Sequence, residues 1–311
     1  MTLPDRVQSR YADLDGPVHY LDFGGPDRPE TTVVAVHGLG GASWNWAAVA
    51  PLLTDRVRLV AVDLAGHGRT PCVAGRSATV QANRALLDRF VRAVVGEPVV
   101  LMGNSMGGAI SLMQAAASPD VVRGLVLVDP ALPRPAFAPV DPRVAATFAA
   151  MSLPGVGEAL LRRRRRLRTP AQQVNDTLML CCVDTTRIPV DVVTLGVALT
   201  EERFTASTDP GELLAAARSL VRMLTAARKF RREMASVRVP VLLLHGDRDR
   251  LVSIKVAQAI ADTHPSWRFE IARGIGHVPQ LEAPKWTASL VFDWLDTGFD
   301  SAHNVASSST R

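Results

Sequence analysis

The stretch of residues 99–117 constrains the fold of this chain more than any other, because it holds 19 residues without a charge. Its length is close to that of a membrane span. Its middle, however, reads Gly103-Asn104-Ser105-Met106-Gly107-Gly108, a glycine-rich run that is typical of a tight turn. A short strand at 99–102, a turn and a buried helix at 106–117 explain the stretch better. We therefore predict a strand–turn–helix unit and no stable membrane insertion.

Short apolar runs and helical patterns alternate over much of the chain. The runs at 99–102, 125–128 and 241–244 are continuously apolar, as is typical of strands covered on both faces of a parallel sheet. Further strands are predicted at 31–36, 57–64 and 267–271, and an antiparallel edge strand at 18–23. Helices are predicted at 44–53, 80–95, 106–117 and 284–295. This rhythm predicts an α/β fold with a mostly parallel sheet flanked by helices.

The rhythm stops after Asp129 and resumes at about residue 237. Between these points Asp141-Pro142, Thr169-Pro170 and Asp209-Pro210 each place a capping residue directly before a proline suited to the first helical position. We therefore predict one core domain, made of residues 1–130 and 237–300, with an inserted all-α cap at 131–236. The small, polar residues 301–311 are predicted to form a disordered tail.

The formal charge of +5 is local, because residues 162–166 are five consecutive arginines and the rest of the chain is balanced. We expect this block on a solvated helix turn, and no nucleic-acid motif accompanies it. The three cysteines fit neither a disulfide framework nor a zinc site. The first residues lack the apolar core of a signal peptide. We therefore expect a cytoplasmic protein that does not bind nucleic acid, with its oligomeric state left open.

The residues around Ser105 have the spacing of a nucleophile elbow, G-x-S-x-G between a strand and a helix. Such a turn forces the serine backbone into a strained conformation and lifts its hydroxyl clear of the sheet. Gly103 and Gly107 flank the serine, since a Cβ at either position would clash with the turn. We therefore predict that Ser105 is a catalytic nucleophile.

A serine hydroxyl needs a base and an orienting carboxylate to act as a nucleophile. His277 stands in a glycine-containing loop after the last predicted strand and is the predicted general base, whereas His19 is expected at the surface. The loop after the strand at 241–244 offers two acids. We favour Asp249 as the orienting acid and expect Asp247 to hold the turn. Asp129, at the end of another strand, is the alternative acid.

Two backbone N–H groups are predicted to form an oxyanion hole. The first belongs to Met106, which directly follows the nucleophile and begins a helix. The second belongs to Leu39, in the loop His37-Gly38-Leu39-Gly40-Gly41, whose glycines allow close backbone approach.

With these motifs, the chain resembles the α/β-hydrolase fold superfamily with a helical cap. The resemblance rests on residues 37–41, 63–70, the Ser105 elbow, the Asp249 loop and Gly276-His277-Val278-Pro279. The order Ser105, Asp249, His277 is the chain order of that superfamily. The segment 63–70 resembles a structural loop, without a catalytic role. The resemblance is specific for fold and triad but not for substrate.

Branches of the superfamily differ at positions that can be compared. Epoxide hydrolases and haloalkane dehalogenases use an aspartate where this chain has Ser105. The elbow is also similar to that of meta-cleavage-product hydrolases, which cut C–C bonds, but those enzymes commonly carry tryptophan where this chain has Val278. The sequence therefore favours a serine esterase or lipase-like hydrolase acting on a small-molecule substrate, with no metal or organic cofactor. A C–C hydrolase, or a non-catalytic ligand-binding protein on the same fold, remains an alternative.

Overall fold

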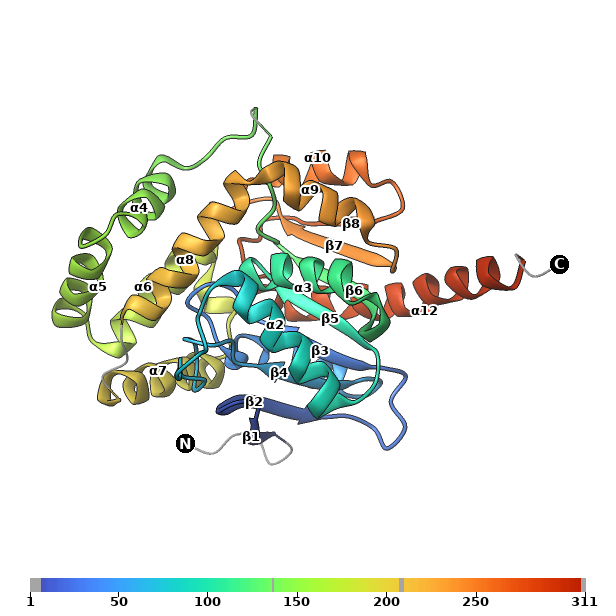
Figure 1. The fold of residues 1–311 in the computed structure, drawn as a ribbon, viewed down its shortest axis with the longest axis horizontal. Coiled ribbons are helices and arrows are strands. Elements are labelled where there is room, and N and C mark those ends of the chain that lie inside the picture. The colour runs from blue at the N-terminus through green and yellow to red at the C-terminus, as the bar shows by residue number, and fades with distance from the viewer. Residues whose placement is uncertain (1–6, 136, 207–209, 309–311) are drawn as a thin grey trace.

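A computed structural model of the chain describes residues 7–135, 137–206 and 210–308, and side chains up to residue 297. Its centre is one eight-stranded sheet with the strand order β1-β2-β4-β3-β5-β6-β7-β8 (Figure 1). β1 and β2 pair antiparallel, β2 also pairs antiparallel with β4, and every other pair is parallel. The strands are β1 (Gln8–Asp13), β2 (Pro17–Gly24), β3 (Thr32–Val36), β4 (Arg58–Val62), β5 (Val99–Asn104), β6 (Val122–Val128), β7 (Val241–Gly246) and β8 (Arg268–Ala272). The predicted mostly parallel α/β sheet is confirmed.

The central strands are apolar throughout because helices cover both faces of the sheet. Residues of β3 and β5 alternate between two cores, as the two-residue period of a strand requires. One core packs against α2 (Val80–Phe90), α3 (Met106–Ala117) and α10 (Ile254–Thr263). The other packs against the short helix α1 (Ala50–Leu53), the 3-10 turn Ser43–Trp46 and α12 (Pro284–Ser308). The carboxyl ends of the parallel strands therefore meet at one edge, where loops carry the candidate site.

Among the described residues between β6 and β7 there are six α-helices and a 3-10 turn at Thr185–Arg187, and we call residues 142–236 the helical insertion. The α-helices are α4 (Pro142–Ser152), α5 (Val156–Leu167), α6 (Pro170–Cys181), α7 (Val190–Thr205), α8 (Pro210–Thr225) and α9 (Ala227–Ser236). α4 and α5 form the outermost layer of the molecule, and both pack on α8 (Figure 1). Asp141 caps α4 and Thr169 caps α6, each before a proline as expected. Asp209 lies outside the described residues.

The two ends of the chain differ from the sequence-based expectation. β1 was not predicted, because its residues are mostly exposed and lack the apolar run of a central strand. Helix α12 continues through residues 301–308, where the sequence predicted a disordered tail. Adding a residue to an existing helix requires no new nucleation, so polar residues can extend a helix that is anchored by packing. Residues 309–311 lie outside the described part.

His19 is buried, which corrects its predicted surface position. Its Nδ1 lies 2.6 Å from Oδ2 of the buried Asp63. Asp63 also accepts hydrogen bonds from the backbone N–H groups of Ser43 and Arg69 at 2.7 and 2.9 Å. Asp63 thus fixes the loop that follows β4. His19 is buried because β1 pairs with β2, so β2 is not the edge strand that the sequence predicted.

No single helix in the described ranges has both the length and the apolarity needed to cross a bilayer. Residues 99–117 form β5, the turn at Ser105 and α3, as predicted.

Candidate active site

Ser105 occupies the turn between β5 and α3 with φ of 52° and ψ of −117°, a conformation that L residues rarely adopt. A Cβ at Gly103 would lie 2.5 Å from the carbonyl oxygen of Gly107, and one at Gly107 would lie 2.1 Å from that of Val36. Only glycine fits at these two positions. Ser105 itself is half-buried, whereas Asn104 and Met106 are buried. Of these three consecutive residues, Ser105 is therefore the one that is accessible at the turn.

His277 and Asp249 are joined by a hydrogen bond of 2.7 Å between Nδ1 and Oδ2. Both oxygens of this fully buried carboxylate are engaged, since Oδ1 accepts from the N–H groups of Leu251 and Val252 at 2.7 and 3.1 Å. Burial alone would raise the pKa of Asp249, but the charge of His277 and its hydrogen bond hold the pKa below the ordinary value. An ionised Asp249 keeps the proton of His277 on Nδ1 and leaves Nε2 as the acceptor.

The serine turn and the histidine loop are tied together by Asn104. Its side-chain amide donates to the carbonyl oxygen of Val128 and to that of His277, each at 3.0 Å. The backbone N–H of His277 in turn donates to the carbonyl oxygen of Cys181, in the helical insertion, at 2.6 Å. Sequence reasoning missed this role of Asn104. Its position directly before the predicted nucleophile was the available signal.

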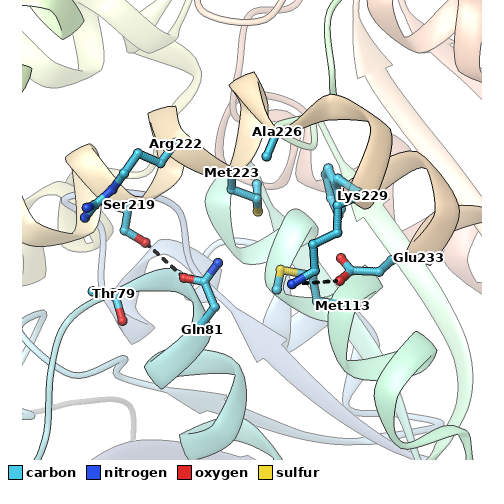
Figure 2. A pocket seen from close by; sticks show the side chains of 10 residues that line it. Thr79, Gln81, Met113, Ser219, Arg222, Met223, Ala226, Lys229 and Glu233 are labelled. Carbon is cyan, nitrogen blue, oxygen red and sulfur yellow. Dashed lines mark hydrogen bonds and ion pairs between the residues drawn. The ribbon is translucent and has the colours of Figure 1, made fainter.

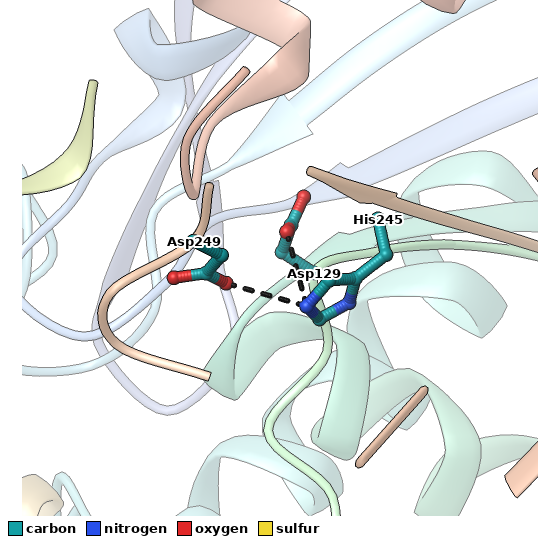
Figure 3. Close-up of side chains that lie close together, drawn as sticks. All are labelled: Asp129, His245 and Asp249. Atoms are coloured by element: carbon teal, nitrogen blue, oxygen red, sulfur yellow. Dashed lines mark ion pairs between the residues drawn. The ribbon is translucent and has the colours of Figure 1, made fainter. Parts of the chain in front are cut away.

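Asp129 follows β6 with φ of 44° and is fully buried. Its Oδ1 accepts from the N–H of Gly246 at 2.9 Å and lies 3.5 Å from Nε2 of His245. The same nitrogen lies 3.6 Å from Oδ2 of Asp249 (Figure 3). Burial, and then repulsion by Asp249, raise the pKa of Asp129 well above its ordinary value. Of the two acids, Asp129 is therefore the one whose charged form is disfavoured by its surroundings.

Asp129, His245 and Asp249 are close enough to one another to hold a cation. However, Oδ2 of Asp249 already accepts from His277, and Nε2 of His245 lies 2.9 Å from the carbonyl oxygen of Val252 as a donor. Burial also lowers the pKa of His245, which stays neutral. We therefore interpret the cluster as a support for Asp249. Asp247 stands apart and accepts from the N–H of Gly274 at 2.7 Å, as a turn-holding residue would.

The loop that carries Leu39 lies against the serine turn. A Cβ at Gly38 would lie 3.1 Å from that of Ser105, and the N–H of Gly41 closes the loop onto the carbonyl oxygen of Gly38 at 3.1 Å. Nε2 of His37 accepts from Leu64 at 3.1 Å, so Nδ1 carries the proton and donates to the same carbonyl of Gly38 at 2.7 Å. Burial lowers the pKa of His37, which keeps this neutral form.

Met106 is the first residue of α3, so its N–H has no partner within the helix. The positive end of the helix dipole lies at this N–H. The two predicted oxyanion donors thus belong to segments that meet at Ser105.

Glu282 joins the histidine loop to the helical insertion, and sequence reasoning missed it. The short helix α11 (Pro279–Glu282) carries this buried carboxylate. Oε1 accepts from the N–H groups of Val183 and Asp184 at 3.0 and 2.9 Å, and Oε2 accepts from that of Gly276 at 2.8 Å. An acid five residues after the predicted base, among apolar residues, was the only signal in the sequence.

Apolar side chains of the helical insertion pack against residues that follow His277. Leu178, Cys182 and Val192 form a small core with Val278 and Leu281. This core anchors the insertion to the histidine loop.

Cys181 contributes its backbone carbonyl to the histidine loop. Burial raises the pKa of its thiol to about 12, which leaves the sulfur protonated and unreactive at neutral pH.

A separate cavity of about 270 Å³ lies between α2 and α3 on one side and α8 and α9 on the other (Figure 2). Its lining includes Gln81, Ser219 and Lys229 but none of the predicted catalytic residues. The hydroxyl of Ser219 accepts from the N–H of Val80 at 2.7 Å, and Lys229 lies 3.9 Å from Glu233. We assign this cavity no ligand.

A sequence model of the alpha/beta hydrolase family matches residues 33–290. Monoacylglycerol lipase ABHD6 of Homo sapiens is 22% identical over 303 residues, which cover 96% of this chain and 84% of that protein. Lipase LipV of Mycobacterium tuberculosis is 39% identical over 108 residues, covering 35% of this chain and 40% of that lipase. The crystal structure of Cfl2 from Burkholderia cenocepacia aligns with a TM-score of 0.77 at 22% identity, covering 93% of this chain and 96% of that chain. Since the family match spans most of its length, the chain belongs to the alpha/beta hydrolase family.

Proposed function

We propose that this alpha/beta hydrolase is a serine hydrolase that cleaves a small to medium, largely apolar carboxylic ester through an acyl-enzyme on Ser105. The observation that carries the proposal is the hydrogen bond of 2.7 Å between His277 and the buried, ionised Asp249, in a loop that Asn104 ties to the strained turn at Ser105. A strained serine and an oriented imidazole on one sheet edge are what acyl transfer requires. The relatives named as lipases are consistent with this chemistry.

In the proposed reaction, Nε2 of His277 removes the proton of Ser105 while Oγ attacks the ester carbonyl carbon. The N–H groups of Leu39 and Met106 donate to the oxyanion that forms. The tetrahedral intermediate collapses, the bond to the leaving alcohol breaks, and the alcohol takes the proton from His277. Water then loses a proton to His277 and attacks the acyl carbon. Collapse of the second intermediate returns the proton to Oγ and releases the acid.

A neutral ester suits the surroundings of His277 better than the anionic dienoate of a meta-cleavage-product hydrolase. Such a dienoate carries a carboxylate that needs a buried cation or several donors. Val278, which follows the histidine, is apolar and buried in the small core with Leu281. Pro279 has no backbone N–H to donate. We expect p-nitrophenyl esters of short to medium acids to be hydrolysed with a far higher kcat/KM than a ring-cleavage dienoate.

The proposal is tested by labelling with a fluorophosphonate and by turnover of p-nitrophenyl butyrate. Ser105→Ala should abolish labelling and lower kcat on the order of 10⁴-fold, as in systems whose triad acts as a unit. Ser289→Ala is the matched control, because Ser289 is exposed on α12 and bonds only to the carbonyl oxygen of Trp286 at 2.9 Å among the described residues. Labelling that persists in Ser105→Ala, or efficient dienoate cleavage without esterase activity, would refute it.

A further inference from the structure

The outer face of α5 combines exposed aliphatic side chains with arginines. Val156, Leu160 and Leu167 are 43%, 43% and 63% exposed. At 100° per residue, Val156, Leu160, Arg163 and Leu167 share one face of the helix. Arg166 borders this face and Arg162 lies further round the helix, and both are exposed. We call these six residues the α5 face.

The orientation of α5 is fixed by the opposite side of the helix. Gly157 is buried, and a Cβ there would lie 2.9 Å from Leu214 and 3.0 Å from the carbonyl oxygen of Met151. Glu158 pairs with Arg218 of α8 at 2.9 Å. Arg165 is turned inward, with its guanidinium 4.8 Å from the ring centre of Phe204. The α5 face therefore points away from the molecule, on its outermost layer (Figure 1).

Nearly all charges of the segment that carries this face are positive, although Arg168 pairs with Asp176 of α6 at 3.3 Å. Residues 142–168 contain seven arginines and a single acid, Glu158, which is already paired. The segment before α4 and the link to α5 expose further large apolar side chains, with Phe137 at 70% and Leu153 at 56%. Aliphatic residues flanked by cations on a surface helix are typical of a helix that lies in a lipid–water interface.

We propose that the α5 face docks this protein on the surface of an anionic lipid bilayer. Its aliphatic residues would enter the boundary between headgroups and acyl chains, while the arginines contact lipid phosphates. A second copy of the chain fits the face poorly, because a symmetric contact would bring the arginines of both copies together. Single-stranded nucleic acid is bound by stacking on aromatic rings, whereas this face offers valine and leucine.

The docking is tested by flotation of the full chain with phosphatidylcholine vesicles, with or without about 30% phosphatidylglycerol. We expect binding to the anionic vesicles only, and weaker binding as salt rises from about 50 to about 500 mM. Each arginine near such a surface contributes roughly fivefold, so R162Q/R163Q/R166Q should lower the partition coefficient about 100-fold. Leu160→Gln, which keeps every charge, should lower it about tenfold.

Helix α9 offers a matched control. R228Q/R231Q/R232Q removes the same charge from exposed positions of a helix whose large apolar residues, Phe230 and Met234, point inward. This variant should keep the partition coefficient within about threefold of the wild type. Thermal unfolding and turnover of p-nitrophenyl butyrate should stay unchanged in all variants, which separates this proposal from the proposed function.

Three results would overturn the proposal: no binding of the wild type to anionic vesicles, equal binding to neutral ones, or equal losses in the α5 and α9 charge variants. Binding of RNA without binding of anionic vesicles would also refute it.

Discussion

The buried carboxylate of Glu282 allows a sharp test of how the helical insertion positions His277. Glu282→Gln preserves the shape of the side chain but replaces one oxygen by an NH₂ group. In the wild type all three N–H groups around the carboxylate are satisfied, two from residues 183–184 and one from Gly276. The glutamine can accept at one end only, so at least one buried N–H faces another donor.

The magnitude follows from these contacts. A buried donor left without an acceptor costs about 1–3 kcal/mol. For a chain of this size we therefore expect the melting temperature to fall by about 2–5 °C. Since Gly276 precedes His277, the imidazole should also lose its alignment. A displacement of about 1 Å can lower a rate 10²-fold, so we expect kcat to fall about 10- to 100-fold while KM changes less than about threefold.

Glu202→Gln is the matched control for the same assays. Glu202 also connects the helical insertion to the core, through Arg69 at 2.7 Å, but its side chain is 50% exposed. An exposed pair contributes at most about 1 kcal/mol, so stability and kcat should barely change. The assays are thermal unfolding and steady-state hydrolysis of p-nitrophenyl butyrate. If both variants behave alike, or if Glu282→Gln lowers stability but leaves kcat intact, Glu282 does not position the histidine.

Three further predictions concern the acids, pH and the arginine block. Asp249→Asn should lower kcat on the order of 10⁴-fold by favouring the wrong tautomer of His277. Asp129→Asn should stay within about tenfold, because Asp129 accepts from the N–H of Gly246 whereas Asp249 holds His277; a larger loss in Asp129→Asn would reverse the assignment. Burial lowers the pKa of His67 to about 3 and also lowers that of His37. Below about pH 6.5 the unfolded chain therefore binds protons that the folded chain does not. The free energy of unfolding should then decrease as the pH is lowered, by up to about 1.4 kcal/mol per pH unit for each histidine. Melting temperatures at pH 7.5 and 5.5 check this, and His67→Gln should flatten the dependence. Replacing Arg162, Arg163 and Arg166 by glutamine should leave turnover of a small neutral ester within about threefold, since these three side chains are exposed, whereas Arg165 is turned inward. A larger loss in steady-state assays would place the block near the substrate.

The central sheet could be predicted because strands covered on both faces must be apolar at every position. The turn at Ser105 could be predicted because the spacing of its glycines is a local pattern. The contact of Gly103 with Gly107 is also local, whereas Gly107 meets the distant Val36. The residues of the bond between His277 and Asp249 could also be predicted. Asp249 follows β7 and His277 follows β8, and these two strands are parallel neighbours, so their loops lie at the same edge of the sheet.

The remaining features depend on contacts between distant segments. Glu282 is defined by the backbone groups of residues 183–184, about 100 positions away, which no local pattern reveals. His19 was misplaced because the exposed strand β1 has no apolar signature, although it covers β2. Which face of α5 points outward likewise depends on the contacts of Gly157 and Glu158 with α8.

The position of the helical insertion also has a consequence for the order of folding. β6 ends at Val128 and its partner β7 begins at Val241, so their pairing closes a loop of about 110 residues. Closing such a loop costs about 4 kcal/mol of chain entropy, and contacts of such high sequence separation form slowly. Ser105 is translated before the insertion, whereas Asp249 and His277 follow it. Refolding chains should therefore regain secondary structure before they regain turnover, and the delay between the two signals measures closure of the β6–β7 pair.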